Sequence, residues 1–348
     1  MKKTILILLF PIFLISCSRE KFEAHSENQF LMGTVCIITL YNGESLDIFN
    51  NAFKVIEEED LLMSLQKGNS ELSRLNSSSG ISAVSVSEDT FNVIRSSLNY
   101  SKISRGAFDP TIAPLVELWG IGEGHDGRVP PSDEIESMKN LTDYRKVELS
   151  DNKEVFLKDR GMKIDLGGIA KGYIADKVKE FLVSNNVKQG IINLGGNIVV
   201  IGSKPGKQPW KIGIQNPFES RGNHIGIVEV IDKTIVTSGI YERFFYSEGK
   251  RYHHILDPET GYPVENDLAS VTIISEMSID ADALSTSLFV LGVEEGIELI
   301  DSIDNSEAVF ITKEKNVIYS SGAAEIFTLN DDTYSEISFN QYKSISLQ

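Results

Sequence analysis

The sequence has few cysteines, few histidines and a shortage of positive charge, and each shortage excludes a class of protein. Two cysteines among 348 residues exclude a disulfide-rich scaffold and a zinc site built from cysteines. Five histidines are too few for a histidine-rich metal cluster, although one is enough for acid–base catalysis. Because 33 Lys and Arg stand against 50 Asp and Glu, the net charge is −17, which argues against nucleic acid as the main partner.

The N-terminus carries an apolar run that is too short to cross a membrane. Residues 4–15 follow Lys2 and Lys3 and would rise about 18 Å as a helix, less than the ~30 Å hydrocarbon core of a bilayer. This length is typical of a secretory signal peptide. The run ends in Leu14-Ile15-Ser16-Cys17, which resembles the bacterial lipoprotein box.

The lipoprotein box implies that residues 1–16 are removed and that Cys17 becomes the lipidated first residue. Residues 17–28 would then form a polar linker. The protein would be exported and lipid-anchored to a bacterial membrane, facing the periplasm or the cell exterior. The alternative is an ordinary signal peptide with an incidental cysteine. The second cysteine, Cys36, lies in an apolar run and is expected to be a buried strand residue.

The remaining chain mixes strand and helix patterns without a regular alternation. Its 41% hydrophobic and 9% aromatic residues are typical of a globular protein, and its length allows two lobes. The mixture predicts an α+β fold and argues against a doubly wound parallel sheet. Apolar spacing predicts helices over 45–65, 87–104, 169–184, 280–292 and 293–303, and strands over 35–41, 147–149, 155–157, 190–201, 210–215, 225–230, 235–238, 244–246 and 252–256.

A first candidate site is the loop over residues 106–111. Gly106 suits a helix C-cap and Asp109-Pro110 suits a turn, so one interpretation is a plain connecting loop. The functional interpretation is a shaped loop whose backbone and Asp109 meet a planar heterocycle.

A second candidate site is the strand-to-helix turn at Gly167-Gly168. The amides of a helix N-terminus favour phosphate oxygens, and Lys171 could reach the same anion. The glycine spacing fits neither a dinucleotide fingerprint nor a P-loop. A tight turn without a ligand is equally compatible. Gly195-Gly196 supplies another double glycine that permits close backbone approach.

A third candidate site holds adjacent histidines, His253 and His254. Neighbours on a strand face opposite sides, so at most one points into a given pocket. Such a histidine could move a proton or bind phosphate near neutral pH, whereas the alternative is that both are merely packed or exposed.

A fourth candidate site is predicted on the helix over 280–292. Asp282 and Thr286 are four residues apart and share a face, with Ser285 beside them. One carboxylate and two hydroxyls form a hard-oxygen set that suits Mg²⁺. The alternative is capping of the helix by Ser278 or Asp280.

These sites, in this order, resemble the ApbE family of FAD:protein FMN transferases. The resemblance covers about residues 30–325 and implies a compact two-lobed α+β architecture related to the T-fold. The transferase domain would span 29–335, followed by a C-terminal tail over 336–348. The matching segments are 32–34, 70–76, 106–111, 163–173, 195–196, 237–239, 254–261 and 281–292.

The resemblance also implies a reaction, in which Mg²⁺ assists transfer of the FMN half of FAD to a threonine hydroxyl of a target flavoprotein, releasing AMP. Such partners include subunits of Na⁺-pumping NADH dehydrogenase or Rnf-type electron transport complexes. His254 would handle the proton. The metal ligands would be Asp282, Ser285, Thr286 and the Gly168 carbonyl, and FAD would contact Met32, Gln66, Ala107, Phe108, Asp109, Asp165, Lys171 and Ile255.

Gln66 departs from the family pattern, because many relatives have a tyrosine there that stacks on the flavin. Loss of the ring should weaken retention of FAD, and relatives without it include enzymes that cleave FAD to FMN and AMP. Two alternatives therefore stand beside the transferase: an FAD pyrophosphatase that uses water, and a non-catalytic flavin-binding lipoprotein.

Overall fold

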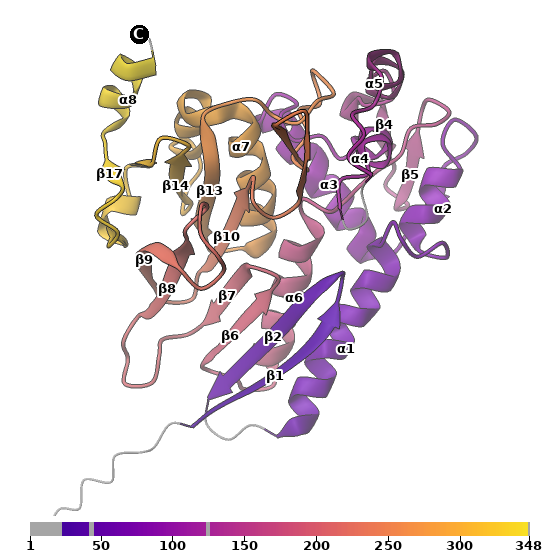
Figure 1. The fold of residues 1–348 in the computed structure, drawn as a ribbon. Coiled ribbons are helices and arrows are strands. Elements are labelled where there is room, and N and C mark those ends of the chain that lie inside the picture. Colours follow the sequence, from indigo (N-terminus) through magenta and orange to yellow (C-terminus); the bar gives the residue numbers. More distant parts are fainter. Residues whose placement is uncertain (1–22, 42–44, 123–125, 347–348) are drawn as a thin grey trace, which may run out of the picture.

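A nine-stranded sheet forms the centre of the molecule (Figure 1). The computed structural model describes residues 23–41, 45–122 and 126–346; the expected signal peptide and Cys17 lie outside them. All neighbouring strands in the sheet are antiparallel except β15 and β17. In spatial order the strands are β1 (Ala24–Leu31), β2 (Thr34–Tyr41), β6 (Gly190–Leu194), β7 (Asn197–Ile201), β10 (Thr234–Gly239), β13 (Leu268–Ser275), β14 (Glu307–Thr312), β15 (Asn316–Tyr319) and β17 (Ser335–Glu336).

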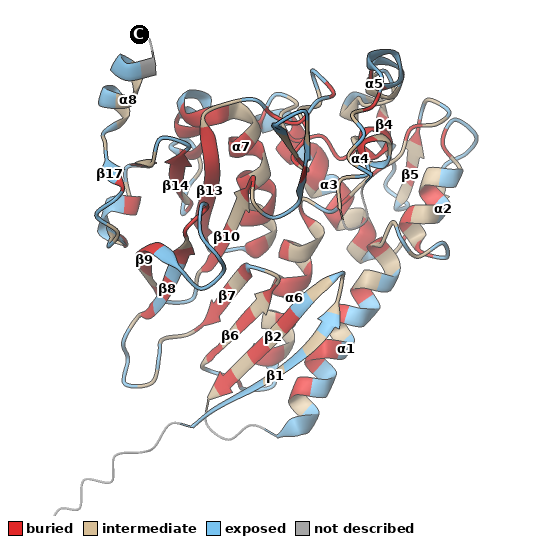
Figure 2. Cartoon of the chain, in the orientation of Figure 1, coloured by how far each residue is buried: buried red, intermediate tan, exposed pale blue. Residues whose placement is uncertain are grey.

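Three long helices cover one face of this sheet: α1 (Leu46–Met63), α6 (Ala170–Ser184) and α7 (Ser278–Ile300). The other face packs on a three-stranded sheet of β8 (Trp210–Gln215), β9 (His224–Val230) and β16 (Phe327–Leu329). Successive side chains of a strand point to opposite faces of the sheet, so both faces receive apolar residues. In β10, Ile235 packs in the core under the small sheet and Val236 packs in the core under α7. With both faces covered, every residue of β13 is buried (Figure 2).

Two smaller units flank the helical side. The first contains α2 (Glu71–Ser77), α3 (Glu88–Ile103) and a sheet of β3 (Val84–Ser85), β4 (Val147–Leu149) and β5 (Glu154–Leu157). The second packs around Trp119 and contains α4 (Ala113–Trp119), α5 (Ser132–Lys139) and the hairpin of β11 (Phe244–Ser247) and β12 (Lys250–His253). The short elements η1 (Tyr144–Lys146), η2 (Ala323–Glu325) and α8 (Phe339–Ser346) complete the described chain.

The expected α+β class is confirmed, and two breaks in the pattern have a local cause. The strand over 190–201 is a hairpin, because Gly195 and Gly196 turn the chain with φ of 65° and 101°. Gly292, with φ of 78°, interrupts α7 where the sequence separates two helices. β1 begins at Ala24, inside the segment assigned to the linker, because its backbone pairs with β2. Residues 336–348, assigned to a tail, include α8.

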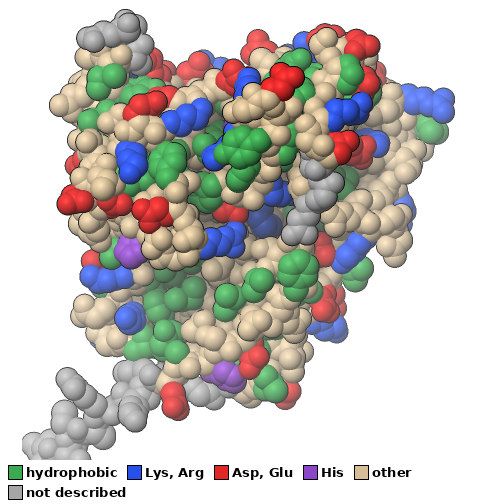
Figure 3. All heavy atoms as spheres, viewed as in Figure 1, with side chains coloured by type: hydrophobic (Ala, Val, Ile, Leu, Met, Phe, Trp, Pro, Cys, Tyr) green, Lys and Arg blue, Asp and Glu red, His purple; other side chains and the backbone are tan. Residues whose placement is uncertain are grey.

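Charged side chains of both signs are interspersed over the face shown in Figure 3. Within the described residues, no helix combines the length and the apolar character needed to cross a membrane.

Candidate active site

The turn that leads into α6 is held by side chains on either side of it. The Asn76 amide clamps the backbone of Ile164, donating to its carbonyl at 3.0 Å and accepting from its N–H at 2.7 Å. Asp165 Oδ1 then accepts from the N–H of Gly167 at 2.7 Å, which shapes the double-glycine turn. Burial raises the pKa of Asp165, opposed by the Gly167 N–H and by the positive charges of Arg243 and Lys171.

Most backbone amides of this turn already have acceptors inside the protein. The N–H of Gly167 bonds to Asp165, those of Ile169 and Ala170 bond to the Leu166 carbonyl, and that of Gly172 bonds to Asp282. Of the groups that the sequence predicts to bind phosphate at this turn, Lys171 is therefore the main one still available to a ligand. The Lys171 ammonium lies 3.1 Å from the Gly167 carbonyl and 3.8 Å from Asp282 Oδ1.

Asp282 is the buried carboxylate at the centre of the site, with an exposed fraction of 4%. Its Oδ2 accepts the N–H of Gly172 at 2.9 Å, and its Oδ1 has only the more distant Lys171 ammonium nearby. Gly172 permits this contact because a Cβ there would lie 2.2 Å from the carbonyl oxygen of Ser278. The glycine thus lets α6 and α7 touch backbone to backbone.

The residues proposed as metal ligands lie together. A Cβ placed on Gly168 would lie 3.4 Å from Thr286 Oγ1, so the start of α6 and the first turns of α7 are adjacent. Ser285 Oγ is 2.8 Å from Ser238 Oγ and donates to the Asp282 carbonyl at 2.9 Å, so this hydroxyl already has two partners.

This donor set fits Mg²⁺. One free carboxylate oxygen, hydroxyls and a backbone carbonyl are hard oxygen ligands of the kind that this cation prefers. No group of three or more His, Cys, Asp or Glu side chains suited to a metal occurs among the residues that the structure covers.

Asp109 shapes its own loop. Its Oδ1 accepts from the N–H and hydroxyl of Thr111 at 2.8 and 2.6 Å, and its Oδ2 accepts from the N–H of Tyr144 at 3.0 Å. Burial raises its pKa against these bonds. Both oxygens are thus engaged within the protein, so contact with a ligand is left to the backbone and to half-buried Ala107.

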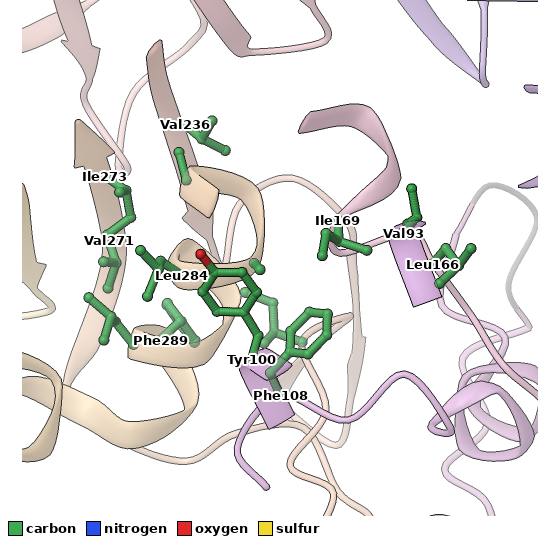
Figure 4. Packing of buried hydrophobic residues seen from close by; sticks show 14 of the residues in the cluster. Val93, Tyr100, Phe108, Leu166, Ile169, Val236, Val271, Ile273, Leu284 and Phe289 are labelled. Carbon is green, nitrogen blue, oxygen red and sulfur yellow. The ribbon is translucent and has the colours of Figure 1, made fainter. Parts of the chain in front are cut away.

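The loop over 106–111 joins the α6 turn. The N–H of Asp165 donates to the Pro110 carbonyl at 2.7 Å. The Phe108 ring would lie 3.1 Å from a Cβ on Gly168. Phe108 itself is buried in the core cluster with Tyr100, Ile169 and Leu284 (Figure 4). The first, second and fourth candidate sites are therefore brought together in one region.

His254 lies just beyond the end of β12, where its Nδ1 is 3.3 Å from the Arg243 carbonyl. A carbonyl only accepts, so Nδ1 carries the proton and Nε2 keeps a lone pair. Burial lowers the pKa of His254 to about 3, helped by the charges of Arg243, His253 and Lys171 and opposed by the bond to the Arg243 carbonyl. His254 is therefore neutral at pH 7, and the lone pair on its Nε2 is available to accept a proton.

His253 faces the other way. It is buried, its Nε2 donates to the Val264 carbonyl at 3.0 Å, and its ring packs edge-on against Phe289. His253 is therefore a packed structural residue, and His254 is the histidine that belongs to the site.

Arg243 was missed by the sequence analysis. Its charge acts on both Asp165 and His254, which places it beside the second and third candidate sites. The register of the predicted hairpin could have identified it, because pairing Phe244 with His253 sets Arg243 opposite His254.

Three expected FAD contacts are not part of this hydrogen-bonded group, although Ile255 shares a core cluster with Phe108. Met32 and Gly33 form the turn between β1 and β2 with φ of 52° and 70°. Gln66 is exposed between α1 and α2, and Ile255 is buried after His254. Within the described chain, no hydrogen bond or ion pair links Met32, Gln66 or Ile255 to Asp282.

Comparisons with known proteins agree with these motifs. A family model described as "ApbE family" matches residues 32–310. An FAD:protein FMN transferase of Klebsiella pneumoniae is 38% identical, with 90% of this chain and 98% of the relative covered. One from Treponema pallidum is 33% identical, with 89% and 91% covered.

Solved structures match as well. The ApbE protein of Thermotoga maritima superposes with a TM-score of 0.80 at 32% identity, covering 87% of this chain and 99% of that one. Flavin transferase ApbE from Vibrio cholerae also gives 0.80, at 29% identity, with 88% and 99% covered.

Proposed function

Because the chain belongs to the ApbE family and is an FAD:protein FMN transferase, we propose that it uses Mg²⁺ and that its acceptor is a threonine hydroxyl of a target flavoprotein. The observation that carries this proposal is the oxygen group of Asp282, Thr286 and Gly168 beside Lys171, with a neutral His254 nearby.

The cation would be held by Asp282 Oδ1, the Thr286 hydroxyl and the Gly168 carbonyl, with Ser285 as a further hydroxyl. When bound, Mg²⁺ neutralises diphosphate charge and polarises the phosphorus. The Gly172 N–H supports this arrangement, because it holds the other oxygen of Asp282.

The chain's own residues would carry the remaining steps. Nε2 of His254 would accept the proton of the attacking hydroxyl, whose oxygen bonds to the phosphorus of the FMN half. The bond from that phosphorus to the bridging oxygen breaks, and AMP leaves with that oxygen. The Lys171 ammonium would offset charge on the phosphates.

The decisive experiment compares wild type and Asp282→Ala in the full-length protein with FAD, Mg²⁺ and a candidate acceptor. Acceptor mass, free FMN and AMP are followed together. We expect the variant to lose both transfer and FAD cleavage, because it lacks the only carboxylate among the proposed ligands. Turnover at the wild-type rate in low Mg²⁺ would show that Asp282 does not hold the metal.

A second activity, hydrolysis of FAD to FMN and AMP, is favoured by Gln66. Its exposed amide stands where the resemblance to the family implies a tyrosine that stacks on the flavin. The same experiment separates the two reactions, since transfer adds mass to the acceptor and hydrolysis releases FMN.

We also propose that the protein is exported and tethered by a lipid on Cys17, and that its acceptor belongs to a membrane complex such as a Na⁺-pumping NADH dehydrogenase or an Rnf-type complex. The motif at 14–17 supports export and the lipid anchor. Replacing Cys17 with Ser should move the protein from the membrane fraction to the soluble fraction, and unchanged fractionation would refute the anchor.

A further inference from the structure

Helix α7 receives its N-terminal cap from another helix. The residue before it, Met277, offers no side-chain cap. Instead the carboxylate of Asp176, on α6, accepts from the N–H of Ser278 with Oδ1 and from that of Ile279 with Oδ2, both at 2.9 Å. Burial raises the pKa of Asp176 to about 6, so the carboxylate is ionised at neutral pH. An ionised carboxylate bound to two helix N–H groups is a strong interaction.

Asp176 and Gly172 together fix α7 at two points. They are four residues apart on one face of α6, and their partners Ser278 and Asp282 are four residues apart on α7. The close backbone approach at Gly172 leaves no room for the helices to move nearer. The two contacts therefore both resist a slide of α7 along α6.

We propose that Asp176 is a positioning residue for the metal site, holding α7 in the register that sets Asp282 and Thr286 opposite Gly168. This inference rests on the proposed magnesium site. A slide of one residue moves a helix by about 1.5 Å. Metal–ligand distances tolerate only about 0.2 Å, so a small displacement is enough to weaken the site.

The fold itself has other support at this point. The Ser278 hydroxyl donates to Asn197 Oδ1 at 2.7 Å and accepts from Thr234 at 3.1 Å. These contacts link the start of α7 to the sheet independently of Asp176. We therefore expect loss of Asp176 to affect the register of α7 more than the presence of the helix.

The test measures metal affinity directly, with Mn²⁺ as a probe followed by the EPR signal of the free ion. The full-length protein is compared with Asp176→Ala, Asp176→Asn and a matched control, Asp331→Ala. The Asp331 carboxylate also accepts a backbone N–H, that of Thr333 at 3.0 Å, in the loop after β16, whose sheet packs on the face of the large sheet away from α6 and α7. Circular dichroism and urea unfolding monitor the fold of each variant.

We expect Asp176→Ala to raise the dissociation constant for Mn²⁺ at least about tenfold, as loss of a supporting residue does at other metal sites. Asp176→Asn keeps one carbonyl oxygen as an acceptor, so its dissociation constant for Mn²⁺ should lie between those of the wild type and Asp176→Ala. Asp331→Ala removes one carboxylate and should leave the metal affinity unchanged. FMN transfer by Asp176→Ala should recover at high Mg²⁺.

Equal metal affinity in wild type and in a folded Asp176 variant would overturn the positioning role. If Asp176→Ala does not fold, Asp176→Asn decides in the same way. Absence of Mn²⁺ binding by the wild type would overturn the metal site, and with it this inference, whereas binding without FMN transfer would count against the proposed acceptor chemistry alone.

Discussion

Gln66 is exposed in the segment between α1 and α2, and its N–H lies 3.3 Å from Ser64 Oγ. We predict that Gln66→Tyr binds FAD more tightly and hydrolyses it more slowly. An aromatic ring adds roughly 0.5–1.5 kcal/mol beyond area burial, which is about two- to tenfold in affinity. Titration with flavin fluorescence measures the change. Gln66→Leu serves as control, because it adds apolar area without a ring, and equal or weaker binding by the tyrosine variant would contradict the stacking role.

Asp109 and Asp282 show the limit of residue-level prediction. Both are buried aspartates near the site, and the sequence predicts a contact with a ligand for each of them. The bonds to Thr111 and Tyr144 engage both oxygens of Asp109, whereas Asp282 keeps one oxygen free of hydrogen bonds. Tyr144 is 35 residues from Asp109 and Gly172 is 110 residues from Asp282. These partners depend on tertiary contacts that no local pattern contains.

At the level of elements, the contact between α6 and α7 depends on Gly172. We predict that Gly172→Ala destabilises the protein by about 1–3 kcal/mol, because the new methyl group would overlap the Ser278 carbonyl and push the helices apart. Urea unfolding measures this loss. Gly68→Ala is the control, since nothing lies within 4 Å of a Cβ there. Similar unfolding curves for both variants would contradict the close approach.

The sequence predicts the four longest described helices, α1, α3, α6 and α7, because their apolar residues recur at helical spacing. It misses the shorter helices α2, α4, α5 and α8, each of seven or eight residues. The sequence is less informative for strands that do not have one buried and one exposed face, because such strands do not alternate between apolar and polar residues. β1 is polar and largely exposed, so it has no apolar alternation to detect. β13 is buried on both faces, so it has no polar face either. Gly292 marks the break in α7 as predicted, whereas the predicted strand over 190–201 runs through Gly195 and misses the hairpin. Both glycines have the positive φ that favours glycine.

At the scale of the whole molecule, acid should destabilise the protein through its buried histidines. Burial lowers the pKa of His253 to about 4, whereas the unfolded chain keeps the ordinary value near 6.5. The unfolded state therefore binds more protons between these values, and the free energy of unfolding falls as pH decreases from 6.5 to 4. The shift corresponds to about 3 kcal/mol.

We predict that His253→Gln reduces the slope of this part of the stability profile and leaves the contribution of His254, measured by urea unfolding between pH 7 and 4. His224→Gln, which replaces an exposed histidine, should leave the slope unchanged. A wild-type slope that survives in His253→Gln would assign the acid sensitivity to other groups.

The bond from Gly172 to Asp282 closes a loop of 110 residues. Closing such a loop orders a long stretch of chain, and contacts of this range slow folding. The site therefore cannot form until the chain as far as Thr286 is present in the compartment where the protein folds. A chain that crosses a membrane unfolded carries neither flavin nor cation with it. Such an enzyme would depend on FAD supplied to the compartment in which it folds, and the supply of that nucleotide would limit how many acceptors it can modify.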